Sequence, residues 1–163
     1  VSFKSLLGQD YYRAGKNIIM YGGTGTGKTM LSTLIGIAAC SEGIPVAFYR
    51  TAGLINLFSE SKSKGTLNTL KKKLGKAEIL ILDEPTASLD PIAEQEIFNQ
   101  FDALRSRKTT IFVSHRLSSA TIANQILVLE NGRLIESGSH QALMAQGGRY
   151  HELFSTQAKR YIS

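Results

Sequence analysis

A glycine-rich stretch at residues 22–29 constrains this chain more than any other feature. It reads GGTGTGKT, follows directly on the apolar run 18–21 and matches G-x-x-x-x-G-K-[ST], the phosphate-binding loop (P-loop, Walker A) that joins a strand to a helix. Glycines allow positive φ angles and let backbone N–H groups approach phosphate oxygens without Cβ clashes. Helix-forming residues follow over 28–40, so the positive end of a helix dipole points at the same anion.

The alternative is a Gly/Thr-rich loop that only turns a strand into a helix, and the motif in this setting favours a nucleotide-phosphate site. The residues predicted to bind the nucleotide are Gly22, Gly23, Thr24, Gly25, Thr26, Gly27, Lys28 and Thr29.

Two acidic residues follow a second apolar run, at 79–82. Asp83 ends this predicted strand, where a carboxylate can hold the magnesium ion of a nucleotide, the Walker B role. Lys28 can reach the β- and γ-phosphates, and the Thr29 hydroxyl can be a magnesium ligand. We therefore predict Thr29 and Asp83 as metal ligands, with ATP and Mg²⁺ as cofactors. A strand that ends in acids without any function is the alternative.

Hydrolysis also requires a positioned water molecule. Glu84 follows the predicted metal ligand and can orient or deprotonate the attacking water. His115 follows the run 111–114 at the end of another predicted strand, where it can contact the γ-phosphate, although a lone histidine is more often a packing or surface residue. The other two histidines are given no role. The predicted catalytic residues are Glu84, His115 and Lys28.

Strands and helices alternate along the chain, which favours an α/β sandwich of three layers with a mostly parallel central sheet. Asn131-Gly132 is the preferred pair for a tight hairpin turn between the last two strands. The strands are expected at 17–21, 45–49, 79–82, 109–114, 126–129 and 134–135. The helices are expected at 3–13, 28–40, 51–61, 67–74, from Asp90-Pro91 onward, after Ser139, and near 150–158. The strand at 45–49 is apolar, so we expect it to be covered on both faces.

Length and composition indicate one domain, spanning 1–163. The hydrophobic share of 42% and the charged share of 20% are those of an ordinary soluble globular protein. No apolar run approaches the roughly 18 residues that span a bilayer, and the first residues lack a signal-peptide layout. The single cysteine, Cys40, excludes an internal disulfide and is expected to pack inside a helix. We expect a cytoplasmic protein with no membrane partner.

The net charge of +6 is concentrated in one segment, Lys62–Lys76, which holds six lysines and no acid. Such a cluster can bind nucleic-acid phosphates, with an affinity that falls steeply as salt rises. It can also be the solvated side of a helix that buries leucines. No aromatic residue lies among the lysines to stack on a base, so we favour the solvated helix, with nucleic acid as the alternative.

The first half, about 2–84, resembles the AAA+ ATPases that assist transposition and load helicases, the IstB and DnaC-like group. The motifs that carry this resemblance are NIIMYG leading into the P-loop, AACSEG at 38–43, VAFYRTA at 46–52 and the stretch 67–84 that ends in ILILDE.

The second half, about 81–163, resembles the nucleotide-binding domain of an ABC exporter. LDEPTASLD at 82–90 is similar to a Walker B motif followed by a D-loop, and IFVSHRL at 111–117 is similar to the strand that carries the switch histidine. ENGRLIESGSH at 130–140 and GGRY at 147–150 are similar to an exporter C-terminus.

Each resemblance lacks the part that a partner subunit uses. Residues 67–78 stand where an ABC domain has its Leu-Ser-Gly-Gly-Gln signature, no Q-loop is recognisable, and Ser114-His115 stand where an AAA+ protein has its sensor asparagine. No arginine finger can be assigned. We therefore hypothesise an engineered chimera of two P-loop NTPase halves, 1–84 and 81–163, joined at the shared Walker B motif.

This hypothesis implies a P-loop NTPase core that binds ATP or another nucleoside triphosphate with magnesium and has weak or no hydrolysis. Slow turnover is expected because the charge-stabilising group that a partner supplies is worth several kcal/mol in this chemistry. Two alternatives stay open: a folded scaffold without useful nucleotide binding, and a nucleic-acid-binding ATPase of the transposition-helper type. The sequence does not fix the base preference or the oligomeric state.

Overall fold

The computed structural model describes residues 15–83, 99, 108–114, 116, 120 and 123–162. The helices expected at 3–13 and from Asp90 onward lie outside this part of the chain. The strands are β1 (Asn17–Tyr21), β2 (Val46–Arg50), β3 (Ile79–Asp83), β4 (Thr109–Ser114), β5 (Gln125–Glu130) and β6 (Arg133–Gly138). The helices are α2 (Lys28–Ser41), α3 (Thr51–Ser63), α4 (Leu67–Gly75), α7 (His140–Gln146) and α8 (Arg149–Ile162).

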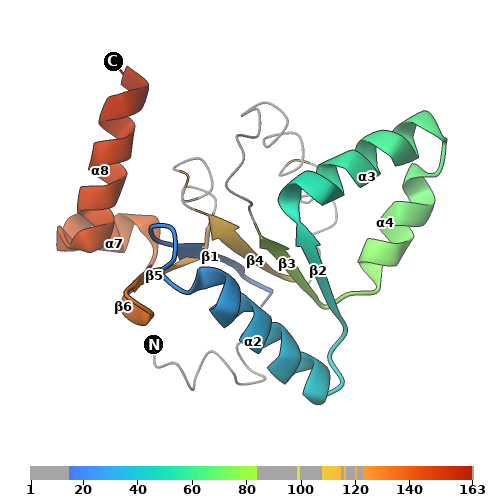
Figure 1. Ribbon diagram of the computed structural model, residues 1–163, viewed down its shortest axis with the longest axis horizontal. Helices are drawn as coiled ribbons and strands as arrows, with labels where there is room; N and C mark the ends of the chain where they lie inside the picture. The colour runs from blue at the N-terminus through green and yellow to red at the C-terminus, as the bar shows by residue number, and fades with distance from the viewer. Residues whose placement is uncertain are drawn as a thin grey trace.

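The strands form one twisted sheet in the order β2-β3-β4-β1-β5-β6 (Figure 1). The first five strands are parallel, and β6 runs antiparallel to β5. The turn between β5 and β6 has Asn131 at φ 50° and Gly132 at φ 72°. Positive φ at both central residues is what a tight type I′ hairpin requires, so the Asn-Gly pair is in the turn that the sequence predicts.

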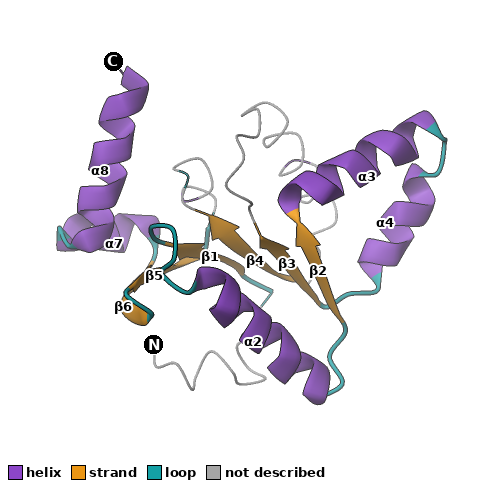
Figure 2. Cartoon of the chain, in the orientation of Figure 1, coloured by secondary structure: helices purple, strands orange, loops and turns teal. Residues whose placement is uncertain are grey.

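Helices cover both faces of the sheet, and this confirms the predicted three-layer α/β fold (Figure 2). The two faces follow from the alternation of side chains along each strand. In β1, Ile18 and Met20 pack with Leu31 and Ile35 of α2. Ile19 and Tyr21 point to the other face, whose core includes buried residues of α3, α4, α7 and α8.

Two burial expectations were wrong. The strand expected at 45–49 is β2, which lies at the edge of the sheet and pairs only with β3, so Phe48 remains 44% exposed. Cys40 is exposed because α2 buries a stripe spaced by four residues, ending at Ala39, and the next residue is rotated about 100° away from it.

The lysine cluster lies on α3 and α4. Leu70 and Leu74 are buried against the sheet, as an amphipathic helix requires. The lysines at 62, 64, 72, 73 and 76 are exposed, and Lys71 is partly buried. Among the described helices, none is long and apolar enough to cross a membrane.

The hydroxyl of Tyr21 is a buried polar group beneath the P-loop. Tyr21 is only 1% exposed, and its Oη has no hydrogen-bond partner within the described ranges. Its ring meets the ring of Tyr150 edge to face, with centroids 5.5 Å apart. Burial raises the pKa of Tyr21 to about 12. The contact between Tyr21 and Tyr150 therefore includes one buried, desolvated hydroxyl group, that of Tyr21.

We expect Tyr21→Phe to raise the free energy of unfolding by about 1 kcal/mol at neutral pH, because it removes an unsatisfied buried hydroxyl and keeps the ring. Below pH 10 Tyr21 is protonated in both the folded and the unfolded chain. Between pH 10 and its folded pKa the unfolded chain ionises first, which favours unfolding.

Urea denaturation at pH 7 and from pH 9 to 11.5 measures both effects. The wild type should lose more stability than the variant over the alkaline range. Tyr150→Phe is the contrasting control, because it removes the 2.8 Å hydrogen bond between Tyr150 Oη and His140 Nδ1 and should destabilise. A Tyr21→Phe protein less stable than the wild type at pH 7 would contradict the prediction.

Candidate functional site

The P-loop links the end of β1 to the start of α2. Gly27, with φ 92°, is the N-cap residue of α2 in the left-handed conformation that glycine adopts without strain. Gly22 lies so close to the carbonyl oxygen of Leu129 that a Cβ atom there would overlap it. Glycine at these two positions is therefore required by the turn and by the close approach of β5.

The ammonium group of Lys28 lies over the loop. Its Nζ donates hydrogen bonds to the carbonyl oxygens of Gly22, at 2.8 Å, and Gly23, at 2.5 Å. The hydroxyl of Thr26 donates to the carbonyl of Gly23 at 2.9 Å. These bonds hold the ammonium group of Lys28 against the carbonyl groups of the loop, at the positive end of the α2 dipole.

The two residues predicted as metal ligands lie in contact. Thr29, in the first turn of α2, places its Oγ1 at 3.2 Å from both carboxylate oxygens of Asp83 at the end of β3. The backbone carbonyl of Asp83 also accepts a hydrogen bond from Thr51 at 3.3 Å, where α3 begins. Parallel strands and one helix thus bring residues 54 positions apart to one edge of the sheet.

The oxygen donors of Thr29 and Asp83 suit a hard cation such as magnesium, which is usually held by one or two protein groups, phosphates and waters. No cluster of three or more His, Cys, Asp or Glu side chains suited to a metal occurs among the residues that the structure describes. Glu84 and His115, the other predicted catalytic residues, lie outside those residues, directly after β3 and β4 in the sequence.

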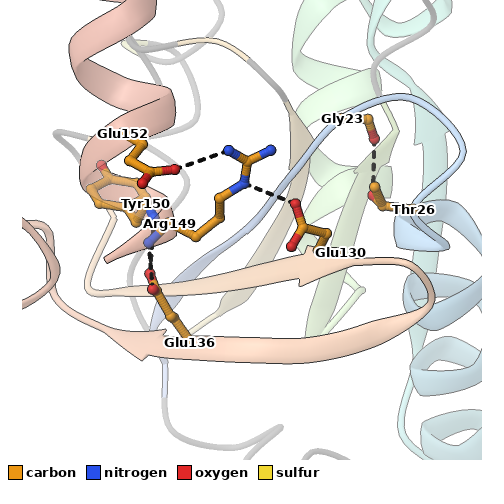
Figure 3. A network of polar contacts seen from close by, with 7 residues as sticks. All are labelled: Gly23, Thr26, Glu130, Glu136, Arg149, Tyr150 and Glu152. Atoms are coloured by element: carbon orange, nitrogen blue, oxygen red, sulfur yellow. Dashed lines mark hydrogen bonds and ion pairs between the residues drawn. The ribbon is translucent and has the colours of Figure 1, made fainter. Parts of the chain in front are cut away.

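A polar network beside the P-loop was not predicted. Arg149, at the start of α8, donates from Nε to Glu130 at 2.8 Å and from a terminal nitrogen to Glu152 at 3.0 Å (Figure 3). The Glu136 carboxylate accepts the backbone N–H groups of Arg149 and Tyr150 at 2.6 and 2.9 Å. The hydrogen bond to Glu152, followed by that to Glu130, raises the pKa of Arg149.

The sequence contains a motif that belongs to this network, but the motif did not predict a role for any of its residues. The motif GGRY at 147–150 contributed only to the ABC resemblance. In the structure, Gly147 ends α7 with φ 68°, and Gly148 leaves room for the Glu136 carboxylate, which a Cβ atom would overlap. An acid on β6 that caps a helix 13 residues later could not be identified by spacing alone.

Comparison with known protein families gives two similarities. The family model described as "IstB-like ATP binding protein" matches residues 2–124. This match extends past residue 84, where the motifs place the end of the first half, and it includes β4.

Curated ATP-binding proteins of ABC transporters match half of the chain. The ABC transporter aclQ of Aspergillus oryzae is 46% identical over 82 residues, which are 50% of this chain and 10% of that protein. The nisin transport ATP-binding protein NisT of Lactococcus lactis is also 46% identical over 82 residues, 50% of this chain and 14% of that protein. The chain therefore spans a small part of the length of these relatives.

A solved structure of a bacterial Atm1-family ABC exporter with ATP bound superposes with a TM-score of 0.61. It is 22% identical, and the match covers 88% of this chain and 37% of the exporter chain, so it shows a shared fold. The family match and the ABC matches together exceed 163 residues and must overlap. The chain is a P-loop ATP-binding domain that belongs to the IstB-like ATP-binding protein family and is similar over half its length to ABC transporter ATP-binding proteins.

Proposed function

We propose that this domain binds ATP, or another nucleoside triphosphate, together with Mg²⁺ at the edge of the sheet formed by the P-loop and the end of β3. The observation that carries the proposal is the contact between Thr29 and Asp83, with oxygens 3.2 Å apart. It joins the phosphate cradle and the acidic strand end into one site. The family match supports ATP as the nucleotide.

The roles follow from the geometry. Backbone N–H groups of the P-loop bind the phosphates, and the Lys28 ammonium exchanges its bonds to the Gly22 and Gly23 carbonyls for bonds to phosphate oxygens. Thr29 and Asp83 would hold the magnesium ion, which when bound would neutralise part of the charge of the phosphates. The nucleotide and the metal thus stabilise one another at this site.

Hydrolysis at this site would be slow. In the proposed step the water oxygen bonds to the γ-phosphorus, the bond from that phosphorus to the β–γ bridging oxygen breaks, and Glu84 takes the proton of the water. His115 contacts the γ-phosphate. The motif that a partner uses to stabilise the developing charge is absent from the sequence, and such groups contribute several orders of magnitude in rate.

We also propose that the chain is a chimera that joins an IstB-like half to an ABC-like half at the Walker B motif. The support is the double similarity: a family match over 2–124 and a separate set of relatives at 46% identity over 82 residues. Both halves are expected to contribute to the one nucleotide site, with Walker A from the first and Walker B shared between them.

Calorimetric titration of ATP with Mg²⁺ tests the nucleotide site. We expect micromolar binding by the wild type and at least about tenfold weaker binding by Lys28→Ala, because a charge-assisted hydrogen bond to phosphate contributes about 1.5–3 kcal/mol. Lys72→Ala, an exposed lysine on α4, is the matched control and should bind like the wild type. Absence of binding by the wild type would favour the alternative of a folded scaffold without nucleotide binding.

The metal ligands are tested by the ratio of two ATP dissociation constants, the one measured in EDTA divided by the one measured with Mg²⁺. In Asp83→Asn and in Thr29→Val we expect this ratio to fall to about a third or less of its wild-type value. Asp83→Asn removes the negative charge that attracts the metal, and Thr29→Val removes the hydroxyl ligand. Thr33→Val is the control: it makes the same change one helical turn later, where the hydroxyl donates to the carbonyl of Thr29. An unchanged magnesium effect in Asp83→Asn would refute the assignment.

A nucleic-acid-binding ATPase is the second candidate function, because lysines of α3 and α4 are exposed. We expect the replacement of Lys71, Lys72 and Lys73 by alanine to leave ATP binding unchanged. Retention of duplex DNA at 150 mM salt should be near background both in the wild type and in this triple variant. Fluorescence anisotropy of labelled DNA across a salt series measures this. Retention by the wild type that weakens with salt and disappears in the triple variant would instead support DNA binding.

A further inference from the structure

Apart from the contact between Thr29 and Asp83, two parts of the chain support the P-loop. One is Tyr21, the last residue of β1, which directly precedes Gly22. The other is residues 129–132, here called the supporting turn, which are the last two residues of β5 and the Asn131-Gly132 turn. The Leu129 carbonyl lies against Gly22, and a Cβ atom on Gly27 would lie 3.7 Å from the Cα of Gly132. The loop therefore sits on the end of β1 and on this turn.

The first turn of α8 contacts both supports, through Tyr150 on Tyr21 and through Arg149 on Glu130. Figure 3 shows the second of these contacts. The ring of Tyr150 packs edge to face on Tyr21, and both residues are at most 1% exposed. The guanidinium of Arg149 bonds Glu130, which lies between Leu129 and Gly132 in the supporting turn. Two consecutive residues of α8 thus hold the two sides of the P-loop base.

The position of this helical turn is itself fixed by β6. The Glu136 carboxylate accepts the backbone N–H groups of both Arg149 and Tyr150, which also suits the positive end of the α8 dipole. Beyond its first turn, α8 extends away from the sheet toward the C-terminal end of the chain (Figure 1). Its base is therefore anchored at the nucleotide site while the rest of the helix projects outward.

The two contacts differ in what they contribute. The Tyr21–Tyr150 contact is buried and adds packing energy. The Arg149–Glu130 pair has side chains 43% and 38% exposed, and an ion pair of this kind adds little to global stability. Its loss should change the position and mobility of the supporting turn more than the stability of the fold.

We propose that Arg149 and Tyr150 are positioning residues that brace the P-loop, so that the α8 base sets the affinity of the site for nucleotide phosphate. This inference rests on the proposed nucleotide binding for its functional consequence. The mechanical part, a P-loop held by α8, does not depend on a nucleotide. It can therefore be tested in the protein alone.

Hydrogen–deuterium exchange of the nucleotide-free protein is the primary test. We expect the P-loop amides at 22–29 to exchange at least about threefold faster in Tyr150→Leu and in Arg149→Met than in the wild type, because local opening becomes easier. Amides of β2, which pairs with β3 at the opposite edge of the sheet, should be unchanged. Faster exchange throughout the protein in both variants would show a general loss of stability and overturn the proposal.

Two matched controls separate bracing from packing. Phe58→Leu makes an aromatic-to-leucine change at a ring of α3 that is buried in the same core. Glu152→Gln weakens the other ion pair of Arg149, the i,i+3 pair within α8. Both should leave P-loop exchange within about 1.5-fold of the wild type. P-loop exchange as fast in these controls as in Tyr150→Leu and Arg149→Met would overturn the proposal.

Nucleotide titration of the same variants separates this inference from the proposed function. If the wild type binds ATP, Arg149→Met and Tyr150→Leu should bind about three- to tenfold more weakly, and Arg149→Lys should recover part of the loss. Equal affinity in all of them would overturn the brace and leave the proposed function intact. If the wild type does not bind ATP, the proposed function fails and the exchange experiment alone decides on the brace.

Discussion

The pairing of β4 with two neighbours at once holds this fold together. β4 lies between β3 and β1, so the strand that ends in Asp83 and the strand that leads into the P-loop do not touch each other. The part of the chain up to Asp83 contributes β1, β2 and β3, and without β4 these strands would leave a gap in the middle of the sheet. The geometry of the nucleotide site therefore depends on a strand from the second half.

Contacts beyond the strand ladders also join the two parts of the chain. Lys108, just before β4, donates from Nζ to the carbonyl of Leu74 at the end of α4, at 2.8 Å. Burial lowers the pKa of this lysine. Asn17 and Asn124 exchange two bonds, from backbone N–H of Asn17 to the side-chain oxygen and from backbone N–H of Asn124 to the carbonyl of Asn17. Neither part would satisfy these groups by itself.

Sequence reasoning succeeded where the signal is local. The P-loop motif, the Asn131-Gly132 turn and the helix start after Ser139 each depend on a few consecutive residues. The turn is present, and α7 begins directly after Ser139, whose hydroxyl accepts the N–H of Ala142. It failed where burial depends on strand order: Phe48 is apolar in sequence, yet its strand is at an edge. The contact of Arg149 with Glu130 was also out of reach, since it requires the positions of α8 and β5 in space.

At the candidate site, the P-loop lies against backbone groups that are far away in the sequence. The loop residues and Lys28 lie in the first part of the chain, but the carbonyl of Leu129 and the turn at Gly132 that lie beside them come from the second. At these contacts the loop presents glycines, which have no side chain to clash with a new neighbour. Gly22 meets the backbone of Leu129 and Gly27 meets Gly132, so these contacts involve backbone atoms rather than side chains, which is compatible with the proposed chimera. The bulky contact, Tyr21 on Tyr150, lies one residue before the loop, where packing rather than phosphate binding decides the fit.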